Sequence, residues 1–294
     1  MAGGTVTLVA TADLVASAAA TDNAVLAFNV ITLEHAEGIA DGVERAGAAA
    51  VLQISENTVR FHGARMAPLL AACAQLATYS SARLSIHLDH FQDVALINEA
   101  IETAADLGAS SIMVDAAHLT YRDNVDRTRT FTERAHAAGL WVEAELGEIG
   151  GKDGQHKGAH APGARTDPDE AVTFAAETAV DGLAVAVGSS HAMTTRNATL
   201  DIALIEKLAA SVAIPLVLHG SSGVSDDQLR LAVGAGIRKV NVGTALNVAY
   251  TGAVRDALAP TATDPRAFLA AGRQAIGDTV AQLCVTVAGE RAAR

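Results

Sequence analysis

The sequence predicts one α/β domain folded as a closed (β/α)8 barrel. Short β-rich runs alternate with segments of helical period, and there are eight such runs in 294 residues. Half of the residues are hydrophobic, which is enough for one large core. The alternation implies parallel strands, and eight of them at this length imply closure. An open doubly wound sheet is the alternative, but no GxGxxG motif follows the first run.

Each predicted strand is an apolar run that ends in polar residues or glycine. In chain order the runs are 24–30, 49–55, 84–90, 111–116, 140–146, 182–189, 215–220 and 237–244. Amphipathic stretches between the runs predict helices; two of them, 93–108 and 126–139, end in the glycine that commonly stops a helix. We expect a single domain over residues 1–294, with an extended helical segment at its C-terminal end.

The charge and composition exclude several classes of partner. The formal net charge is -12 and the pI is near 5.2, so a negative field would repel nucleic acids and anionic membranes. No basic segment precedes an apolar core at the start, and no apolar stretch reaches the length of a membrane span. Cys73 and Cys284 lie far apart in helical segments. These features predict a cytoplasmic, reduced protein that binds neither nucleic acid nor membrane.

Polar residues stand at the ends of all eight predicted strands. They are Asn29, Ser55, Asp89 with His90, Asp115, Glu145, His191, His219 and Asn241. The carboxyl ends of barrel strands, with their βα loops, are where reactive residues gather in this architecture. The sequence therefore predicts a functional site at that end of the barrel.

Three histidines in this set predict a metal site. His90, His191 and His219 follow strands three, six and seven, so barrel closure can bring three imidazoles around one point. Three neutral nitrogens with one open position are a usual arrangement for catalytic Zn²⁺. Asp115 and Glu145 can hold a second ion or orient the histidines. The other histidines receive no ligand role, and His87 is expected to form a hydrogen bond in the barrel interior.

Six ordered motifs identify a family resemblance. HLDH, MVDAAH, VEAELGEIGG, VAVGSSH, VLHGSSG and KVNVGT resemble the class II, metal-dependent ketose-bisphosphate aldolases, the group with the fructose- and tagatose-bisphosphate enzymes. The resemblance runs from about residue 29 to residue 244, with an echo near the C-terminus. It implies a TIM barrel, a catalytic zinc ion, and a sugar phosphate cleaved reversibly to dihydroxyacetone phosphate and an aldehyde.

The resemblance also implies roles for individual residues. His90, His191 and His219 match the zinc ligands, Asp115 and Glu145 match a second metal position, and Asp89 matches an acid/base. The loops that would hold the dihydroxyacetone phosphate half comprise Gly220, Ser221, Ser222, Asn241, Val242, Gly243 and Thr244. Asn29 and Ser55 are further substrate-binding candidates. Phosphate sites are frequent after strands seven and eight of such barrels, which agrees with this assignment.

Asp89 then has a specific task in the cleavage. The proton of the C4 hydroxyl leaves and an enediolate forms, whose negative charge needs an electrophile such as zinc. Asp89 stands next to the ligand His90 and is placed to exchange that proton. A carboxylate that only orients His90 is the alternative.

Departures from the family pattern leave the substrate open. Asp153 stands where the family has a glutamate on the loop after strand five, in a segment that reads as a lid. Ala192 replaces a usual glycine, and Gly243 replaces an aspartate of many fructose-bisphosphate members. Loss of that carboxylate weakens the discrimination between substrates more than it weakens the catalytic reaction. A fructose- or tagatose-type ketose 1,6-bisphosphate is expected, with another ketose 1-phosphate as the alternative.

An arginine in the C-terminal segment suggests that the protein is an oligomer. Arg273, in the C-terminal echo, is a candidate for contacting a neighbouring subunit's substrate, which suggests a homodimer or homotetramer. A second divalent ion or a monovalent cation is a further possible cofactor.

Three other functions compete with the zinc-dependent aldolase. They are a metal-dependent hydrolase, a non-catalytic sugar-phosphate binding protein, and a Schiff-base aldolase using Lys239 on strand eight.

Overall fold

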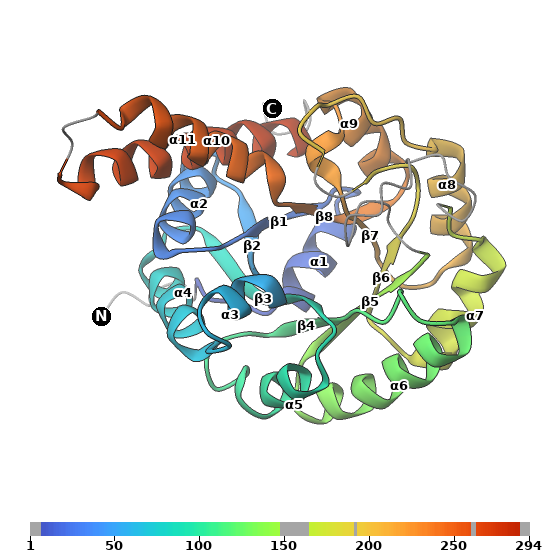
Figure 1. The fold of residues 1–294 in the computed structure, drawn as a ribbon. Coiled ribbons are helices and arrows are strands. Elements are labelled where there is room, and N and C mark those ends of the chain that lie inside the picture. Colours follow the sequence, from blue (N-terminus) through green and yellow to red (C-terminus); the bar gives the residue numbers. More distant parts are fainter. Residues whose placement is uncertain (1–6, 148–164, 191–192, 260–262, 289–294) are drawn as a thin grey trace, which may run out of the picture.

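The computed structural model describes residues 7–147, 165–190, 193–259 and 263–288, and its strands close into one barrel. All neighbouring strands are parallel, in the order β1 to β8, and β8 pairs with β1. The strands are β1 (Val25–Asn29), β2 (Ala49–Ser55), β3 (Arg83–Phe91), β4 (Ser111–Val114), β5 (Trp141–Leu146), β6 (Gly182–Val185), β7 (Leu216–Leu218) and β8 (Ile237–Val242). The predicted (β/α)8 TIM barrel is confirmed (Figure 1).

Helices surround the barrel and form its outer layer (Figure 1). They are α1 (Thr11–Ala19), α2 (Leu33–Arg45), α3 (Glu56–Phe61), α4 (Ala67–Tyr79), α5 (Val94–Thr103), α6 (Tyr121–Ala137), α7 (Pro168–Thr178), α8 (Ile202–Ser211), α9 (Asp226–Ala235), α10 (Thr244–Ala257) and α11 (Pro265–Ala288). The main apolar core lies between these helices and the outward-facing strand residues, such as Leu52, Ile86 and Val240. No helix in the described part of the chain could cross a membrane.

Helix α1 was not among the predicted elements, and it covers the amino-terminal end of the barrel. Leu14 and Val15 of α1 pack against Val25, Ala27 and Val51 inside the first strands. In Figure 1 the helix is visible behind the barrel centre. This contact fills the base of the barrel interior with apolar side chains.

Above that base the barrel interior is polar. Buried inward-facing residues include Gln53, His87, Glu143, Lys239 and Asn241, where such barrels usually carry branched aliphatic side chains. Burying polar groups is costly unless they are hydrogen-bonded, so the interior is held by a connected network. A polar interior directly beneath the strand ends indicates that this end of the barrel is built around a site.

The extended C-terminal segment is confirmed as α10 and α11. Together they project beyond the barrel at one side, and α11 packs along α2 (Figure 1). Two ion pairs join α2 to α11: Arg45 with Asp278 at 2.8 Å and Arg273 with Glu37 at 2.7 Å. Both pairs are largely exposed, so the apolar contact between the helices carries most of the attachment.

Candidate functional site

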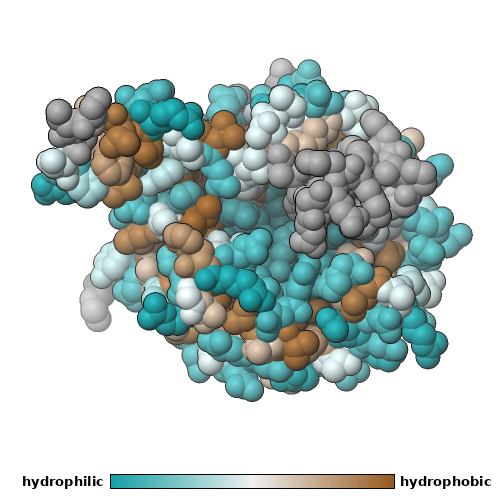
Figure 2. Space-filling model, viewed as in Figure 1, coloured by the Kyte–Doolittle hydropathy of each residue, from teal (hydrophilic) through white to brown (hydrophobic). Residues whose placement is uncertain are grey.

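A polar pocket of about 380 Å³ opens at the carboxyl ends of the strands. Figure 2 shows this hollow near the centre of the face, with hydrophilic residues inside it. Eleven predicted site residues line it: Asn29, Ser55, Asp89, His90, Asp115, Gly220, Ser221, Ser222, Asn241, Gly243 and Thr244. The structure thus brings together residues that are more than two hundred positions apart in the sequence.

The remaining predicted residues lie elsewhere or outside the described residues. Glu145 and His219 are fully buried just beneath the pocket wall. Val242 is buried and borders a separate cavity against α11. Arg273 pairs with Glu37 on the outside of the barrel. Asp153, His191 and Ala192 fall in 148–164 and 191–192, outside the described residues.

An irregularity in β3 turns both Asp89 and His90 toward the pocket. Simple alternation would put neighbouring residues on opposite faces of the sheet. The register with β4 shifts between Leu88 and Phe91, which adds one residue to β3, and His90 adopts a left-handed conformation with φ 53°. Such bulges often re-aim side chains beside functional sites, and positive φ is uncommon outside glycine. The bulge therefore explains how adjacent residues can serve one site.

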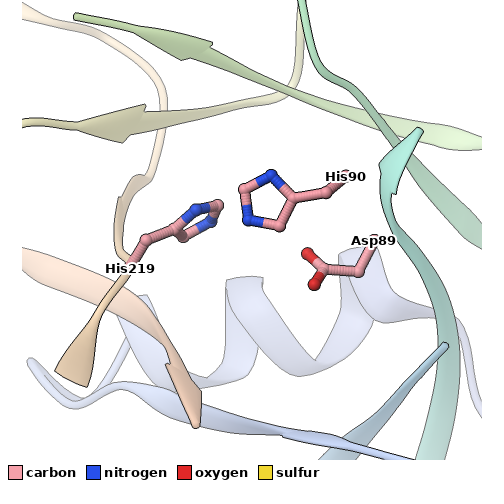
Figure 3. A group of neighbouring side chains, drawn as sticks. All are labelled: Asp89, His90 and His219. Carbon is pink, nitrogen blue, oxygen red and sulfur yellow. The ribbon is translucent and has the colours of Figure 1, made fainter. Parts of the chain in front are cut away.

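Among the residues that the structure describes, two groups of side chains have the geometry of metal ligands. Asp89, His90 and His219 each offer a donor atom, and these atoms lie within 4.8 Å of one another; the same holds for His90, Asp115 and Glu145. Figure 3 shows Asp89, His90 and His219 converging from β3 and from the end of β7. The His90 and His219 rings are 4.7 Å apart between centroids. Nitrogen and carboxylate donors in this arrangement suit Zn²⁺, so the residues present fit the expected metal.

Carboxylates hold both described histidines in place. His90 Nδ1 lies 2.9 Å from Asp115 Oδ2, and Gln92 Nε2 donates to the same oxygen at 3.0 Å. His219 Nε2 lies 2.8 Å from Glu143 Oε1, and its Nδ1 lies 3.4 Å from Glu145 Oε2. Carboxylates of this kind fix the orientation of histidine ligands and increase their basicity.

The electrostatics of this cluster favour a bound cation. Burial lowers the pKa of His219, but its hydrogen bonds to Glu143 and Glu145 outweigh burial and raise the pKa to about 9. Burial raises the pKa of Glu143, but the charge of Lys239 and the His219 hydrogen bond hold it well below its usual range. Without a metal ion, the His219 ring therefore carries an additional proton between Glu143 and Glu145, and a bound metal ion would displace that proton.

His87 is a structural residue of the barrel interior, as expected. Its Nδ1 pairs with Ser111 Oγ at 2.8 Å, and its Nε2 lies 4.0 Å from both Asp89 Oδ1 and Glu143 Oε2. Burial lowers the pKa of His87 to about 3, with the positive charge of Lys239 as the next cause. The ring is therefore neutral near pH 7 and adds no charge beneath the site.

The loop after β7 is tied to its neighbours by serine hydroxyls. Ser221 Oγ donates to the Asn241 carbonyl at 2.5 Å, and Ser222 Oγ accepts from the Ala245 N–H at 3.0 Å. Gly220 has φ 66°, and a Cβ there would lie 2.5 Å from the Ser190 carbonyl oxygen. Glycine is therefore required at this turn. The turn brings the loop beside the N-terminus of α10, where helix N–H groups favour anions.

Several site residues were not predicted. Gln53 lines the pocket and donates to Asn29 Oδ1 and, at 3.5 Å, to Asp89 Oδ2. Glu56 accepts the Gln92 and Asp93 N–H groups at 2.7 Å each and so joins α3 to the loop after β3. Glu143 supports His219 from below. Alternation was the available signal: Gln53 and Glu143 each stand two positions before a predicted site residue on the same strand.

The geometry bears on the Schiff-base rival. Lys239 is fully buried, donates to Glu143 Oε2 and Asn241 Oδ1 at 2.8 Å each, and is not among the residues that line the pocket. A lysine that forms an imine must be deprotonated and must reach the substrate carbonyl. Lys239 is held beneath the pocket wall by Glu143 and Asn241, so it does not reach the space where a substrate carbonyl would lie.

The fold and the site together define a parallel barrel with histidine and carboxylate side chains gathered at its carboxyl end in groups that could hold a metal ion. Residues 9–290 match the family model for "Fructose-bisphosphate aldolase class-II". The chain therefore belongs to the class II fructose-bisphosphate aldolase family.

Solved structures of similar proteins agree with this membership. The YdjI aldolase from Escherichia coli K12 is 25% identical, with a TM-score of 0.79 over 97% of this chain and 99% of that one. A candidate fructose-1,6-bisphosphate aldolase from Coccidioides immitis is 26% identical, with a TM-score of 0.83 over 95% and 96%. The fructose-bisphosphate aldolase of Campylobacter jejuni, at 18% identity and a TM-score of 0.77 over 94% and 93%, shares the fold.

Proposed function

We propose that this protein is a zinc-dependent aldolase that reversibly cleaves a ketose phosphate to dihydroxyacetone phosphate and an aldehyde. The observation that carries the proposal is the convergence of Asp89, His90 and His219 beside the loops of Gly220 and Gly243 in one pocket. A metal site alone would also suit a hydrolase, but the adjoining loop and helix N-terminus suit a phosphate.

His90, His191 and His219 would hold the zinc ion, and Asp115 and Glu145 would orient these ligands or hold a second cation. Zinc supplies the positive charge that stabilises an enediolate oxygen. Asp115 Oδ2 lies 2.9 Å from His90 Nδ1, which supports its orienting role.

Asp89 would take the proton of the C4 hydroxyl during cleavage and return it during synthesis. Its Oδ1 accepts from Asn241 Nδ2 at 3.3 Å and its Oδ2 from Gln53 Nε2 at 3.5 Å, so two amides fix the carboxylate at the pocket floor. Asp153 would be the acid/base for the substrate carbon.

Gly220, Ser221, Ser222 and the first turn of α10 would bind the phosphate of the dihydroxyacetone half. Asn29 and Ser55, at the ends of the adjoining strands β1 and β2, would contact the aldehyde half. A Cβ at Gly243 would lie 3.2 Å from Asn29 Cγ, so glycine leaves room for Asn29 where an aspartate would crowd it. We therefore propose a fructose- or tagatose-type 1,6-bisphosphate, or another ketose 1-phosphate, as the substrate.

We further propose a cytoplasmic homodimer or homotetramer. The projecting α10 and α11 carry exposed apolar residues, including Val248 at 52% and Val285 at 61% exposure, which suit a subunit contact. Arg273 would reach a neighbouring subunit's pocket only if its pair with Glu37 opened on assembly.

The first test is a retro-aldol assay of the zinc-loaded protein on fructose 1,6-bisphosphate, tagatose 1,6-bisphosphate and a series of ketose 1-phosphates. We expect release of dihydroxyacetone phosphate from at least one substrate, abolished by EDTA and restored by zinc. EDTA-insensitive release would contradict the zinc mechanism. A zinc-loaded protein that cleaves none of them would contradict this substrate class.

A further inference from the structure

The interior beneath the pocket contains an ion pair that the proposed chemistry does not use. Glu143 on β5 and Lys239 on β8 are both fully buried, and Lys239 Nζ donates to Glu143 Oε2 at 2.8 Å. Neither residue lines the pocket. Each partner also contacts a residue of the site itself, Glu143 through His219 and Lys239 through Asn241.

We propose that Lys239 and Glu143 are a positioning pair that fixes the hydrogen-bonding state of Asn241 and His219 for catalysis. This inference rests on the proposed function and deepens it. The pair acts from below the site, and the chemistry is performed by the residues that it holds.

Lys239 determines which way the Asn241 amide faces. An ammonium group only donates hydrogen bonds, so the Asn241 atom 2.8 Å from Nζ is the carbonyl oxygen Oδ1. The amide nitrogen then faces the other way, and Asn241 Nδ2 lies 3.3 Å from Asp89 Oδ1. Asp89 thus receives an N–H donor. With the amide reversed, an oxygen would face the carboxylate and repel it.

Glu143 determines which nitrogen of His219 carries the proton. The Nε2 atom of His219 lies 2.8 Å from Glu143 Oε1 and 3.0 Å from Asn241 Nδ2. An ionised carboxylate only accepts hydrogen bonds and forms the stronger, charge-assisted bond, so Nε2 carries the N–H toward Glu143 and the Asn241 amide directs its hydrogens to Asp89. The Nδ1 atom then lies on the side of the ring where Glu145 Oε2 stands, 3.4 Å away. A histidine ligand binds a metal through a nitrogen that carries no proton, so this arrangement assigns Nδ1 to the metal.

The two roles need each other because both charges are buried. A carboxylate without a counter-charge at 0% exposure is strongly disfavoured, and so is an ammonium group. Glu143 uses one oxygen for each partner, Oε1 for His219 and Oε2 for Lys239. The pair therefore joins the metal ligand His219 to the Asp89 support Asn241 through a single rigid unit.

Lys239→Met tests the pair by removing the donor and the charge at similar length. We expect the zinc dissociation constant, measured by chelator competition, to rise about 10–100-fold. The rate of deuterium uptake by dihydroxyacetone phosphate should fall as well. Arg238→Met is the matched control on the same strand, because Arg238 pairs with Asp22 outside the barrel. Zinc affinity and exchange rate within about twofold of the control would overturn the proposal.

A double variant covers the case in which Lys239→Met does not fold. Lys239→Met with Glu143→Gln removes both charges but leaves an amide oxygen to accept from His219. We expect zinc affinity to recover to within about 10-fold of wild type, with exchange still slow because Asn241 is not held. Exchange at the wild-type rate would show that the pair serves only stability and would overturn the proposal.

The state of His219 can also be read in the unmodified protein. Nitrogen-15 NMR of the zinc-loaded protein, with the ring assigned by comparison with His219→Asn, should show a proton on Nε2. A proton on Nδ1 would overturn the inference. Neither the zinc affinity nor the protonation of the His219 ring depends on turnover. If the wild-type protein fails to exchange dihydroxyacetone phosphate, that result contradicts the proposed function. The zinc affinity and the ring state still test the role of the pair at His219.

Discussion

Asp89→Asn is expected to lower kcat for ketose phosphate cleavage by about 10²–10⁴-fold while zinc remains bound. Asparagine has the same shape, so it can keep an oxygen toward Asn241 Nδ2, 3.3 Å from Asp89 Oδ1 in the wild type. It cannot take a proton from the C4 hydroxyl, because a neutral amide is not a base near pH 7. The measurement is steady-state cleavage kinetics together with the zinc content of the purified variant.

A partial reaction separates this role from a structural one. Deuterium uptake by dihydroxyacetone phosphate involves only the carbon proton, so Asp89→Asn should slow it far less than cleavage. Asp106→Asn, the same substitution at an exposed site after α5, is the control and should leave both rates unchanged. Equal losses in the cleavage rate and the exchange rate would contradict the acid/base role. They would indicate instead that Asp89 only orients the metal ligand His90.

His219→Ala is expected to abolish both zinc binding and turnover. The change removes a nitrogen donor within 4.8 Å of donors on Asp89 and His90, and it leaves Glu143 and Glu145 buried without the ring between them. Two carboxylates that lose a shared partner in a low-dielectric interior also repel each other. We therefore expect reduced thermal stability together with the loss of metal. Zinc per chain after dialysis, measured by atomic absorption, is the primary readout.

His87→Ala distinguishes ligand loss from the loss of any buried histidine. His87 is also fully buried, and its ring pairs with Ser111. Its deletion should lower stability, because a cavity remains and Ser111 Oγ, which still donates to Thr11 Oγ1, loses its bond to the ring, but the zinc content should stay near wild type. Full zinc content in His219→Ala would contradict the three-histidine site.

The alternation of strands and helices was sufficient to predict the barrel and where its site lies. Each predicted strand overlaps an observed one. Strand β6 ends at Val185, several residues before its predicted end, and β7 ends at Leu218, two residues before its predicted end. The excess lies in the loops, because residues such as Ala186 and Val187 continue the apolar run without strand pairing. The polar residues at the run ends were informative because barrel geometry gathers them, whatever their separation in sequence.

The sequence could not predict how neighbouring residues share one site. Asp89 and His90 face the pocket together only because β3 bulges against β4, and a bulge leaves no periodic signal. The pairing of Lys239 with Glu143 joins residues 96 positions apart and depends on barrel closure. Before the structure, Lys239 was only a candidate imine-forming lysine. Its buried contacts with Glu143 and Asn241 now suggest a different task.

In the proposed reaction the pocket binds dihydroxyacetone phosphate beside a zinc ion and removes its C3 proton. Proton NMR of dihydroxyacetone phosphate in D₂O with zinc-loaded protein tests this claim without knowledge of the aldehyde. We expect loss of one C3 proton signal as deuterium enters from solvent, stopped by EDTA and restored by zinc. An unchanged C3 signal, with zinc verified in the protein and the ligand shown to bind, would contradict it.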